Sequence, residues 1–256
     1  MSKAAPALRA ALVLCLLLIL SPEADAGERE AEPGESVVLL HGLGRTSGSM
    51  GRLERFLRGH GYRVVNLGYP SRRKPIGELS RHLHERLASC CAGERPVHFV
   101  THSLGGILLR YAHAERPIAG LGRVVMLAPP SQGSEWVDLL EASGLDRGLL
   151  GPSGQDLGTR EESAPNRLKP PDFELGIVAG ERSLNPLGSW LIPGPDDGTV
   201  AVERTRLEGM ADFAVVPHSH SFIMRSPRVH ELVLRFLRDG RFEPGSESGE
   251  AGGRGD

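Results

Sequence analysis

Short apolar runs without regular polar alternation recur along the chain, and they predict strands that are buried on both faces. Each run is rich in Val, Leu, Ile or Phe and ends at a Gly, a Pro or a polar loop. We expect six strands, at residues 36–40, 62–66, 97–102, 123–128, 173–179 and 213–216.

Segments with helical spacing of apolar residues separate several of these runs. Residues 76–91 carry Ile and Leu at near-helical intervals, and shorter helices are expected at 52–57, directly after Ser103 and at 229–238. Alternation of strands and helices predicts a mostly parallel central sheet with helices on both faces, an α/β fold. Ligands bind at the carboxyl ends of the strands in such sheets.

Residues 131–172 interrupt this alternation because they lack strand character. Gly, Pro and polar residues dominate the segment, although Trp136, Leu139 and Leu140 form a short amphipathic turn. We expect a short lid-like insertion over the carboxyl ends of the strands, and a mobile lid and a packed excursion both fit the sequence.

The two ends of the chain differ in composition from the middle. Lys3 and Arg9 precede an apolar run at residues 10–20, and Ala24-Asp25-Ala26 supplies the small residues of an export cleavage site. We therefore expect a signal peptide at 1–26, hence an exported protein; an uncleaved N-terminal membrane anchor is the alternative. A single globular domain is expected at 27–242, followed by a disordered Gly/Ser/Glu-rich tail at 243–256.

Composition excludes several classes of function. The formal net charge of -2 provides no basic field for nucleic acid, and no G-K-[ST] sequence is present for a phosphate-binding loop. Cys90 and Cys91 are adjacent, so we expect two small buried thiols at a helix end instead of a disulfide.

The most informative stretch is Thr101-His102-Ser103-Leu104-Gly105. An apolar run ends abruptly at Ser103, and a helix-compatible run follows. A nucleophile elbow needs this order of strand, sharp turn and helix, because the turn lifts the serine hydroxyl clear of the strand end. Thr101 departs from the usual Gly at the first position. A plain strand-to-helix turn with Ser103 as N-cap is the alternative.

A serine nucleophile needs a base held by a carboxylate, and both follow Ser103 in the order typical of hydrolases with this elbow. The loop at 192–200 offers Asp196 and Asp197, and the loop at 217–222 offers His218 and His220. Asp197 and Val200 form the D-x-x-V pattern that is common at the acid of such a triad, which favours Asp197 as the acid.

The apolar residues that follow His220 favour it as the base over His218. The H-x-H spacing of the two histidines could instead indicate a zinc site, but no carboxylate at suitable spacing supports one. We expect no metal and no cofactor.

A Gly-rich loop follows the first predicted strand. Its glycines, Gly42, Gly44 and Gly48, lack the G-x-G-x-x-G spacing of a dinucleotide site. Small residues at this place are also typical of an oxyanion loop, in which a backbone N–H points into the site. We expect His41 to order that loop through its ring nitrogens.

From Ser36 to about Phe242, the chain resembles the α/β-hydrolase superfamily, in particular its small bacterial exported esterase/lipase-like members. The motifs that carry the resemblance are VVLLHGLGRT, FVTHSLGGILLR, VVMLAPPSQGSE, PGPDDGTVAVERT and VVPHSHSFIM. The resemblance implies the α/β-hydrolase fold. It also implies that Ser103 is the nucleophile, Asp197 the acid and His220 the base. The N–H groups of Leu43 and Leu104 would form the oxyanion hole, and Gln132 would line the substrate pocket.

These residues predict a serine carboxylic-ester hydrolase of esterase or lipase type that works through an acyl-enzyme. A small-molecule or lipid ester is the expected substrate, and residues 131–172 could contact a lipid interface. An acyltransferase with the same triad and a non-catalytic binding protein on the hydrolase fold are the alternatives.

Overall fold

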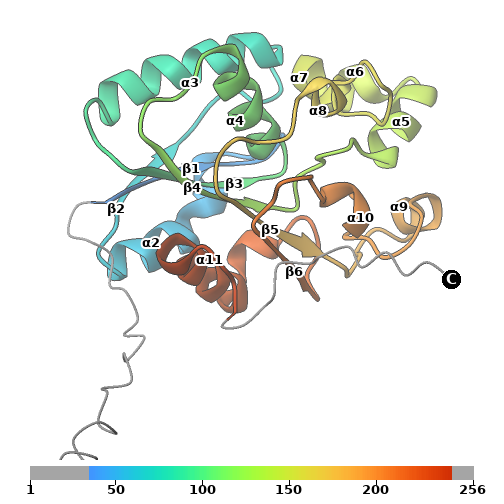
Figure 1. The fold of residues 1–256 in the computed structure, drawn as a ribbon. Helices are drawn as coiled ribbons and strands as arrows, with labels where there is room; N and C mark the ends of the chain where they lie inside the picture. The colour runs from blue at the N-terminus through green and yellow to red at the C-terminus, as the bar shows by residue number, and fades with distance from the viewer. Residues whose placement is uncertain (1–34, 244–256) are drawn as a thin grey trace, which may run out of the picture.

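A single six-stranded parallel sheet forms the centre of the computed structural model, which describes residues 35–243 (Figure 1). Its spatial order is β2-β1-β3-β4-β5-β6, and every neighbouring pair is parallel. The strands are β1 (Ser36–Leu40), β2 (Arg63–Leu67), β3 (Val97–His102), β4 (Leu121–Leu127), β5 (Leu175–Gly180) and β6 (Asp212–Val216). All six predicted strands are therefore present, with ends shifted by at most two residues.

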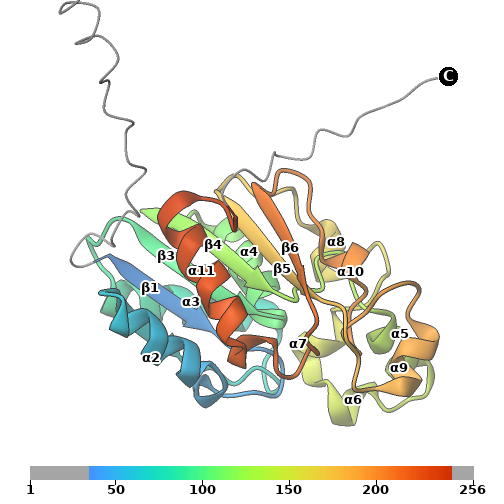
Figure 2. The same ribbon diagram turned by 90° about the horizontal axis from the view of Figure 1, so that it is seen from below.

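Helices cover both faces of the sheet, as the alternation predicts. On one face lie α3 (Ile76–Cys90) and α4 (Leu104–Glu115), and on the other lie α2 (Gly51–Gly59) and α11 (Pro227–Asp239) (Figure 2). Two separate apolar clusters reflect these two layers, one containing Leu83 and Leu108 and the other Leu53 and Phe236. Burial on both faces explains why the strands read as unbroken apolar runs.

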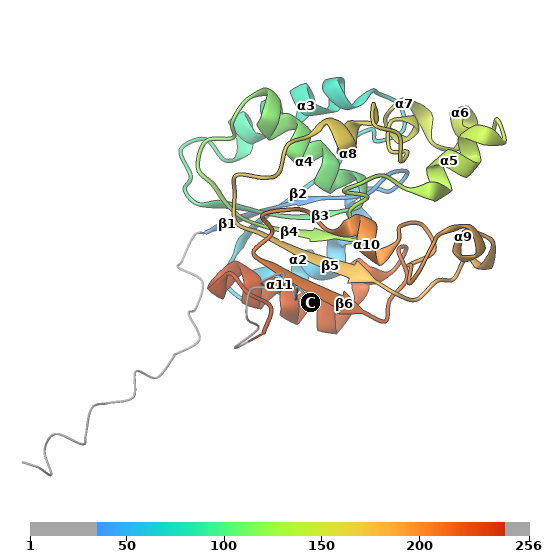
Figure 3. The same cartoon turned by 45° about the vertical axis from the view of Figure 1, so that its right-hand side comes forward.

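The carboxyl ends of the strands carry the remaining elements, which gather at one end of the molecule (Figure 3). After β4 come α5 (Glu135–Ala142), α6 (Asp146–Leu149), α7 (Gly151–Gln155) and α8 (Ala164–Arg167). After β5 come α9 (Pro186–Leu191) and α10 (Val202–Thr205). Two 3₁₀ turns, η1 (Ser47–Met50) and η2 (Ile223–Arg225), complete the element order.

The insertion at 131–172 is folded and packed against the domain. Arg110 of α4, almost fully buried, donates to the backbone oxygens of Ser131 at one end of the insertion and of Leu168 and Lys169 at the other. Burial lowers the pKa of Arg110 to about 10. One side chain of α4 thus anchors the insertion where it leaves the domain and where it rejoins it.

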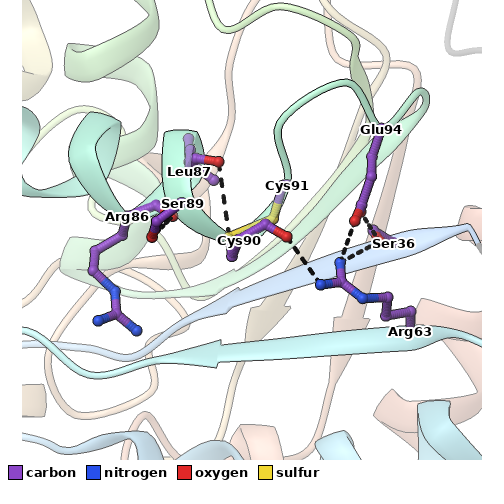
Figure 4. Close-up of a disulfide and its surroundings, with 8 residues drawn as sticks. All are labelled: Ser36, Arg63, Arg86, Leu87, Ser89, Cys90, Cys91 and Glu94. Atoms are coloured by element: carbon purple, nitrogen blue, oxygen red, sulfur yellow. Dashed lines mark hydrogen bonds and ion pairs between the residues drawn. A yellow bond between two sulfur atoms is a disulfide. The ribbon is translucent and has the colours of Figure 1, made fainter.

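The two cysteines differ from the sequence expectation. Cys90 and Cys91 are joined by a disulfide at the end of α3 (Figure 4), so the prediction of two free thiols was wrong. Cys91 has already left the helical conformation, with φ -134° and ψ 18°, which lets the adjacent side chains face one another. Next to the disulfide, Arg63 donates to the Cys90 carbonyl oxygen at 2.9 Å and pairs with Glu94.

The predicted signal peptide at 1–26 and nearly all of the predicted tail lie outside the described residues. Within residues 35–243, no helix is both long and apolar enough to cross a bilayer. In the same part of the chain, no cluster of three or more His, Cys, Asp or Glu side chains could hold a metal ion.

Candidate active site

Ser103 lies on a strained turn between β3 and α4. Its φ is 52° and its ψ is -121°, a conformation that non-glycine residues rarely adopt. The turn needs close packing beneath it: a Cβ at Gly105 would lie 2.7 Å from the carbonyl oxygen of Leu40 in β1. The local geometry is that of a nucleophile elbow.

Thr101 fits the elbow because a neighbouring position gives it room. The Thr101 side chain is fully buried, and a Cβ at Gly106 would lie 3.2 Å from its Oγ1 and 3.0 Å from the sulfur of Met126. Gly106, one position after the last glycine of the usual pattern, therefore leaves room for a threonine at residue 101, where glycine is usual.

Gly105→Ala should destabilise the fold, because the added methyl group has no space between α4 and β1. We expect the free energy of unfolding to fall by about 1–3 kcal/mol, measured by urea unfolding. Gly51→Ala is the matched control, since nothing lies within 4 Å of a Cβ there. Equal stability of the two variants would contradict the tight contact at the elbow.

A continuous chain of hydrogen bonds joins Ser103, His220 and Asp197. The Oγ of Ser103 lies 2.9 Å from Nε2 of His220, and Nδ1 of His220 lies 2.7 Å from Oδ2 of Asp197. Asp197 is 2% exposed and Ser103 is 7% exposed, so the chain is largely shielded from water. The structure thus brings together the three residues that the sequence favours.

The other oxygen of Asp197 fixes the carboxylate in place. Oδ1 accepts hydrogen bonds from the backbone N–H groups of Thr199 at 3.0 Å and Val200 at 2.8 Å. Because both neighbours donate to Oδ1, Oδ2 is free to accept from His220. This arrangement sets the His220 tautomer, with the proton on Nδ1 and the lone pair of Nε2 facing Ser103.

Asp196, the neighbouring carboxylate, has a structural position. Its Oδ1 accepts from the N–H of Gly198 at 2.7 Å and from the hydroxyl of Ser189 in α9 at 2.8 Å. It therefore caps the turn, and it is buried instead of facing solvent. The hydroxyl that donates to it comes from α9, a helix that the sequence pattern did not predict.

His218 lies apart from the Ser103–His220–Asp197 chain. Its Nε2 is hydrogen-bonded to the hydroxyl of Ser226 at 2.7 Å, and Ser226 is the N-cap of α11. The preference for His220 over His218 agrees with this geometry.

His220→Ala should remove acyl-enzyme formation, whereas His218→Ala should change kcat by less than about tenfold, or about 1.4 kcal/mol. The reason is that only His220 lies within hydrogen-bond reach of Ser103. Burst-phase kinetics with a chromogenic ester measure both effects. An active His220→Ala protein beside an inactive His218→Ala protein would contradict the assignment.

The two predicted oxyanion donors are the N–H groups of Leu43, in the loop after β1, and of Leu104, at the start of α4. No hydrogen bond among the described residues uses the N–H of Leu43 or of Leu104, the first residue of α4. His41 orders the loop, as predicted: its Nδ1 lies 2.9 Å from the Gly42 oxygen, and its Nε2 accepts from the Tyr69 N–H at 3.2 Å. Burial lowers the pKa of His41, which keeps the ring neutral for this pattern.

Sequence reasoning missed the partners that hold this loop from the β2 side. The Tyr69 ring stacks on His41 with centroids 4.2 Å apart, and its hydroxyl donates to the His41 oxygen. Ser71 accepts from the Gly44 N–H at 3.1 Å. The stretch Leu67-Gly68-Tyr69-Pro70-Ser71 directly follows a strand, and that was the available signal.

The insertion packs directly on the oxyanion loop. A Cβ at Gly154 in α7 would lie 2.6 Å from the Leu43 side chain, and Ser153 donates to the backbone oxygen of Ser71. These contacts place α7 of the insertion against the loop after β1.

Gln132 lies at the start of the insertion with an exposed side chain. Its Nε2 donates to the backbone oxygens of Arg206 at 3.2 Å and Glu203 at 3.4 Å, next to α10. In this position Gln132 ties the insertion to the segment that follows the Asp197 loop. A contact with substrate stays a prediction.

Comparison with known families agrees with this arrangement. A family model described as Alpha/beta hydrolase family matches residues 37–239, and the chain belongs to that family. No protein of curated function matches the sequence significantly.

Solved structures of several hydrolases share the fold. Lipase BlEst2 of Bacillus licheniformis in its mature form superposes with a TM-score of 0.59 at 21% identity, over 77% of this chain and 89% of the lipase. Phospholipase PlaB of Legionella pneumophila gives 0.62 at 16% identity, over 82% of this chain and 60% of PlaB. The metagenomic carboxyl esterase MGS0156 superposes with a TM-score of 0.57 at 18% identity, over 75% of this chain and 66% of the esterase. At these identities the likeness concerns the fold.

Proposed function

We propose that the protein is a serine ester hydrolase in which Ser103, His220 and Asp197 act as a catalytic triad. The observation that supports this most is the unbroken hydrogen-bond chain from the Ser103 hydroxyl to the Asp197 carboxylate. The strained elbow and the unpaired N–H groups beside it add the remaining parts of an acyl-transfer site.

In the proposed reaction, His220 Nε2 takes the hydroxyl proton as Ser103 Oγ attacks the ester carbonyl carbon. Asp197 stabilises the imidazolium that forms, and the Leu43 and Leu104 N–H groups stabilise the negative oxygen. Collapse of the tetrahedral intermediate breaks the ester bond, and His220 returns the proton to the departing alcohol. Water then attacks the acyl-enzyme by the same route and regenerates Ser103.

A series of p-nitrophenyl esters from acetyl to long-chain acyl tests this proposal on the mature protein. We expect saturable hydrolysis of at least one member, with a burst that reports acyl-enzyme formation. Absence of turnover throughout the series, in a protein that is folded, would contradict it. Added alcohol acceptors in the same assay separate hydrolysis from acyl transfer.

We further propose that the substrate is a lipid ester taken from an aggregate or membrane surface. Among the described side chains of residues 35–243, six large hydrophobic ones are exposed, and five of them lie in the segments that follow the carboxyl ends of β4, β5 and β6. These five are Leu145, Leu149, Leu184, Trp190 and Phe222. Trp190, on α9, is 82% exposed, and α9 contacts α5 of the insertion. Exposed apolar side chains gathered near a site are typical of lipid or protein contact, and tryptophan favours a lipid–water interface.

Trp190 should insert into phosphatidylcholine vesicles, because its ring leaves water there. In a Trp136→Phe protein, Trp190 is the remaining tryptophan, and we expect its fluorescence emission to shift to shorter wavelength when vesicles are added. Trp190→Ser in the otherwise native chain should weaken co-sedimentation with vesicles yet leave turnover of a soluble short-chain ester unchanged. Unchanged emission together with no vesicle binding would contradict the lipid contact.

Export is a separate part of the proposal and rests on the first 26 residues of the sequence. N-terminal sequencing of the protein recovered from a secreting host should begin at Gly27. A protein that still carries residues 1–26 and is found in the membrane fraction would favour the membrane anchor instead.

A further inference from the structure

His102, the last residue of β3, lies against the residue proposed as the base. Its side chain is 1% exposed, and its ring centroid is 4.9 Å from that of His220. Its Nε2 lies 2.9 Å from the backbone oxygen of His220. Neither the strand nor the elbow turn requires a histidine here.

The hydrogen-bond partners define the proton position on this ring. A carbonyl oxygen only accepts, so Nε2 of His102 carries a proton and donates it to His220. The other nitrogen, Nδ1, is buried without a hydrogen-bond partner and faces the oxyanion loop, where a Cβ at Gly42 would lie 2.7 Å away. A second proton on Nδ1 would have no acceptor.

The surroundings of His102 also disfavour a charged ring. Burial is the main cause that holds its pKa well below the usual value. The charges of His220, Arg45 and His41 act in the same direction, and the hydrogen bond to the His220 backbone opposes them only in part. The ring therefore stays neutral, as a donor from Nε2. A neutral neighbour also avoids repulsion when His220 becomes an imidazolium.

The main chain of His220 is held from two sides. Its N–H donates to the backbone oxygen of Asp197 at 3.0 Å, and its carbonyl accepts from His102. These two hydrogen bonds fix the position of the His220 backbone, and the backbone position determines how close Nε2 of the ring lies to Ser103. Small displacements of a catalytic group are costly, since about 1 Å can lower the rate about 100-fold.

We infer that His102 is a positioning residue, whose Nε2–H holds the His220 main chain at the place from which the His220 ring reaches the Ser103 hydroxyl. This inference rests on the proposed function of the triad. On this inference, His102 acts by donating a hydrogen bond and not merely by filling space. A side chain of similar length without a donor would fill the space equally well but would not hold the His220 carbonyl.

A matched pair of variants tests this distinction. In His102→Gln the amide can still donate near the former Nε2 position, whereas His102→Met has similar length and no donor. We expect His102→Met to lower kcat for a p-nitrophenyl ester by about 10- to 100-fold with KM within about threefold. His102→Gln should recover kcat to within about fivefold of the native protein.

His230→Met is the control for loss of a buried histidine. His230 is buried in α11, and its Nε2 is bonded to the backbone oxygen of Met224, at 3.0 Å, and not to a residue of the triad. We expect this variant to lower Tm without changing kcat. Native kcat in His102→Met, or an equal loss in the Met and Gln variants, would overturn the inference.

Two further measurements remove dependence on the folding of the variants. In the native protein labelled with ¹⁵N-histidine, His102 should appear as the neutral Nε2–H tautomer at about pH 7. An Nδ1–H tautomer or an imidazolium would overturn the inference. Reaction of the native protein with a fluorophosphonate separates the two proposals: an inert native protein counts against the triad itself, whereas a reactive one leaves the His102 variants to decide the positioning role.

Discussion

Ser103→Ala should abolish ester hydrolysis, with kcat lowered by about 10⁴- to 10⁶-fold. The substitution removes the hydroxyl oxygen proposed as the nucleophile, together with its hydrogen bond to His220. Alanine keeps the Cβ at this turn, so the backbone strain is unchanged and the fold should survive. Steady-state kinetics and far-UV circular dichroism measure the two effects.

Ser131→Ala is the matched control for this variant. Ser131 is also buried, and its hydroxyl has no hydrogen-bond partner among the described residues. We expect its activity to stay close to that of the native protein. Residual turnover of Ser103→Ala within about tenfold of the native rate would move the nucleophile elsewhere, with Ser131 the next residue to test.

Asp197→Asn should lower kcat by about 10⁴-fold. The N–H groups of Thr199 and Val200 both point at Oδ1, so the amide oxygen of an asparagine must face them. Its NH₂ group then faces Nδ1 of His220 and donates to it. His220 is thereby held with its proton on Nε2, where it cannot accept the proton of Ser103.

Asp196→Asn provides the control one residue away. The Asp196 oxygen that accepts from Gly198 and Ser189 is retained in an asparagine. We therefore expect little change in kcat. Reversed effects at the two positions would show that the acid is Asp196 and that the tautomer argument fails.

The sheet could be predicted from the sequence because burial on both faces leaves an unmistakable apolar run. The location of Ser103, Asp197 and His220 at one edge of the sheet then followed, since each comes after a strand and parallel strands have their carboxyl ends at the same edge. The amphipathic turn expected around Trp136 corresponds to α5. The short helices α6 to α10 could not be predicted, because four to six residues carry little periodicity and depend on tertiary contacts such as those of Arg110.

Side-chain partnerships across distant segments were equally hidden. The stacking of Tyr69 on His41 and the bond from His102 to the His220 carbonyl join residues 28 and 118 positions apart. The hydrogen bond to Asp196 from Ser189 was hidden too, because Ser189 belongs to the unpredicted α9. The disulfide at Cys90 depended on where α3 ends, and helix ends are the least certain part of a sequence reading.

Reaction of the folded native protein with a fluorophosphonate, followed by intact-mass and peptide mass spectrometry, tests the central claim most directly. An activated serine attacks the phosphorus and expels fluoride, which leaves one stable adduct. The account predicts one adduct per chain, on the peptide that carries Ser103, and none in Ser103→Ala or after unfolding. A native protein that stays unmodified, or an adduct on any other residue, would contradict it.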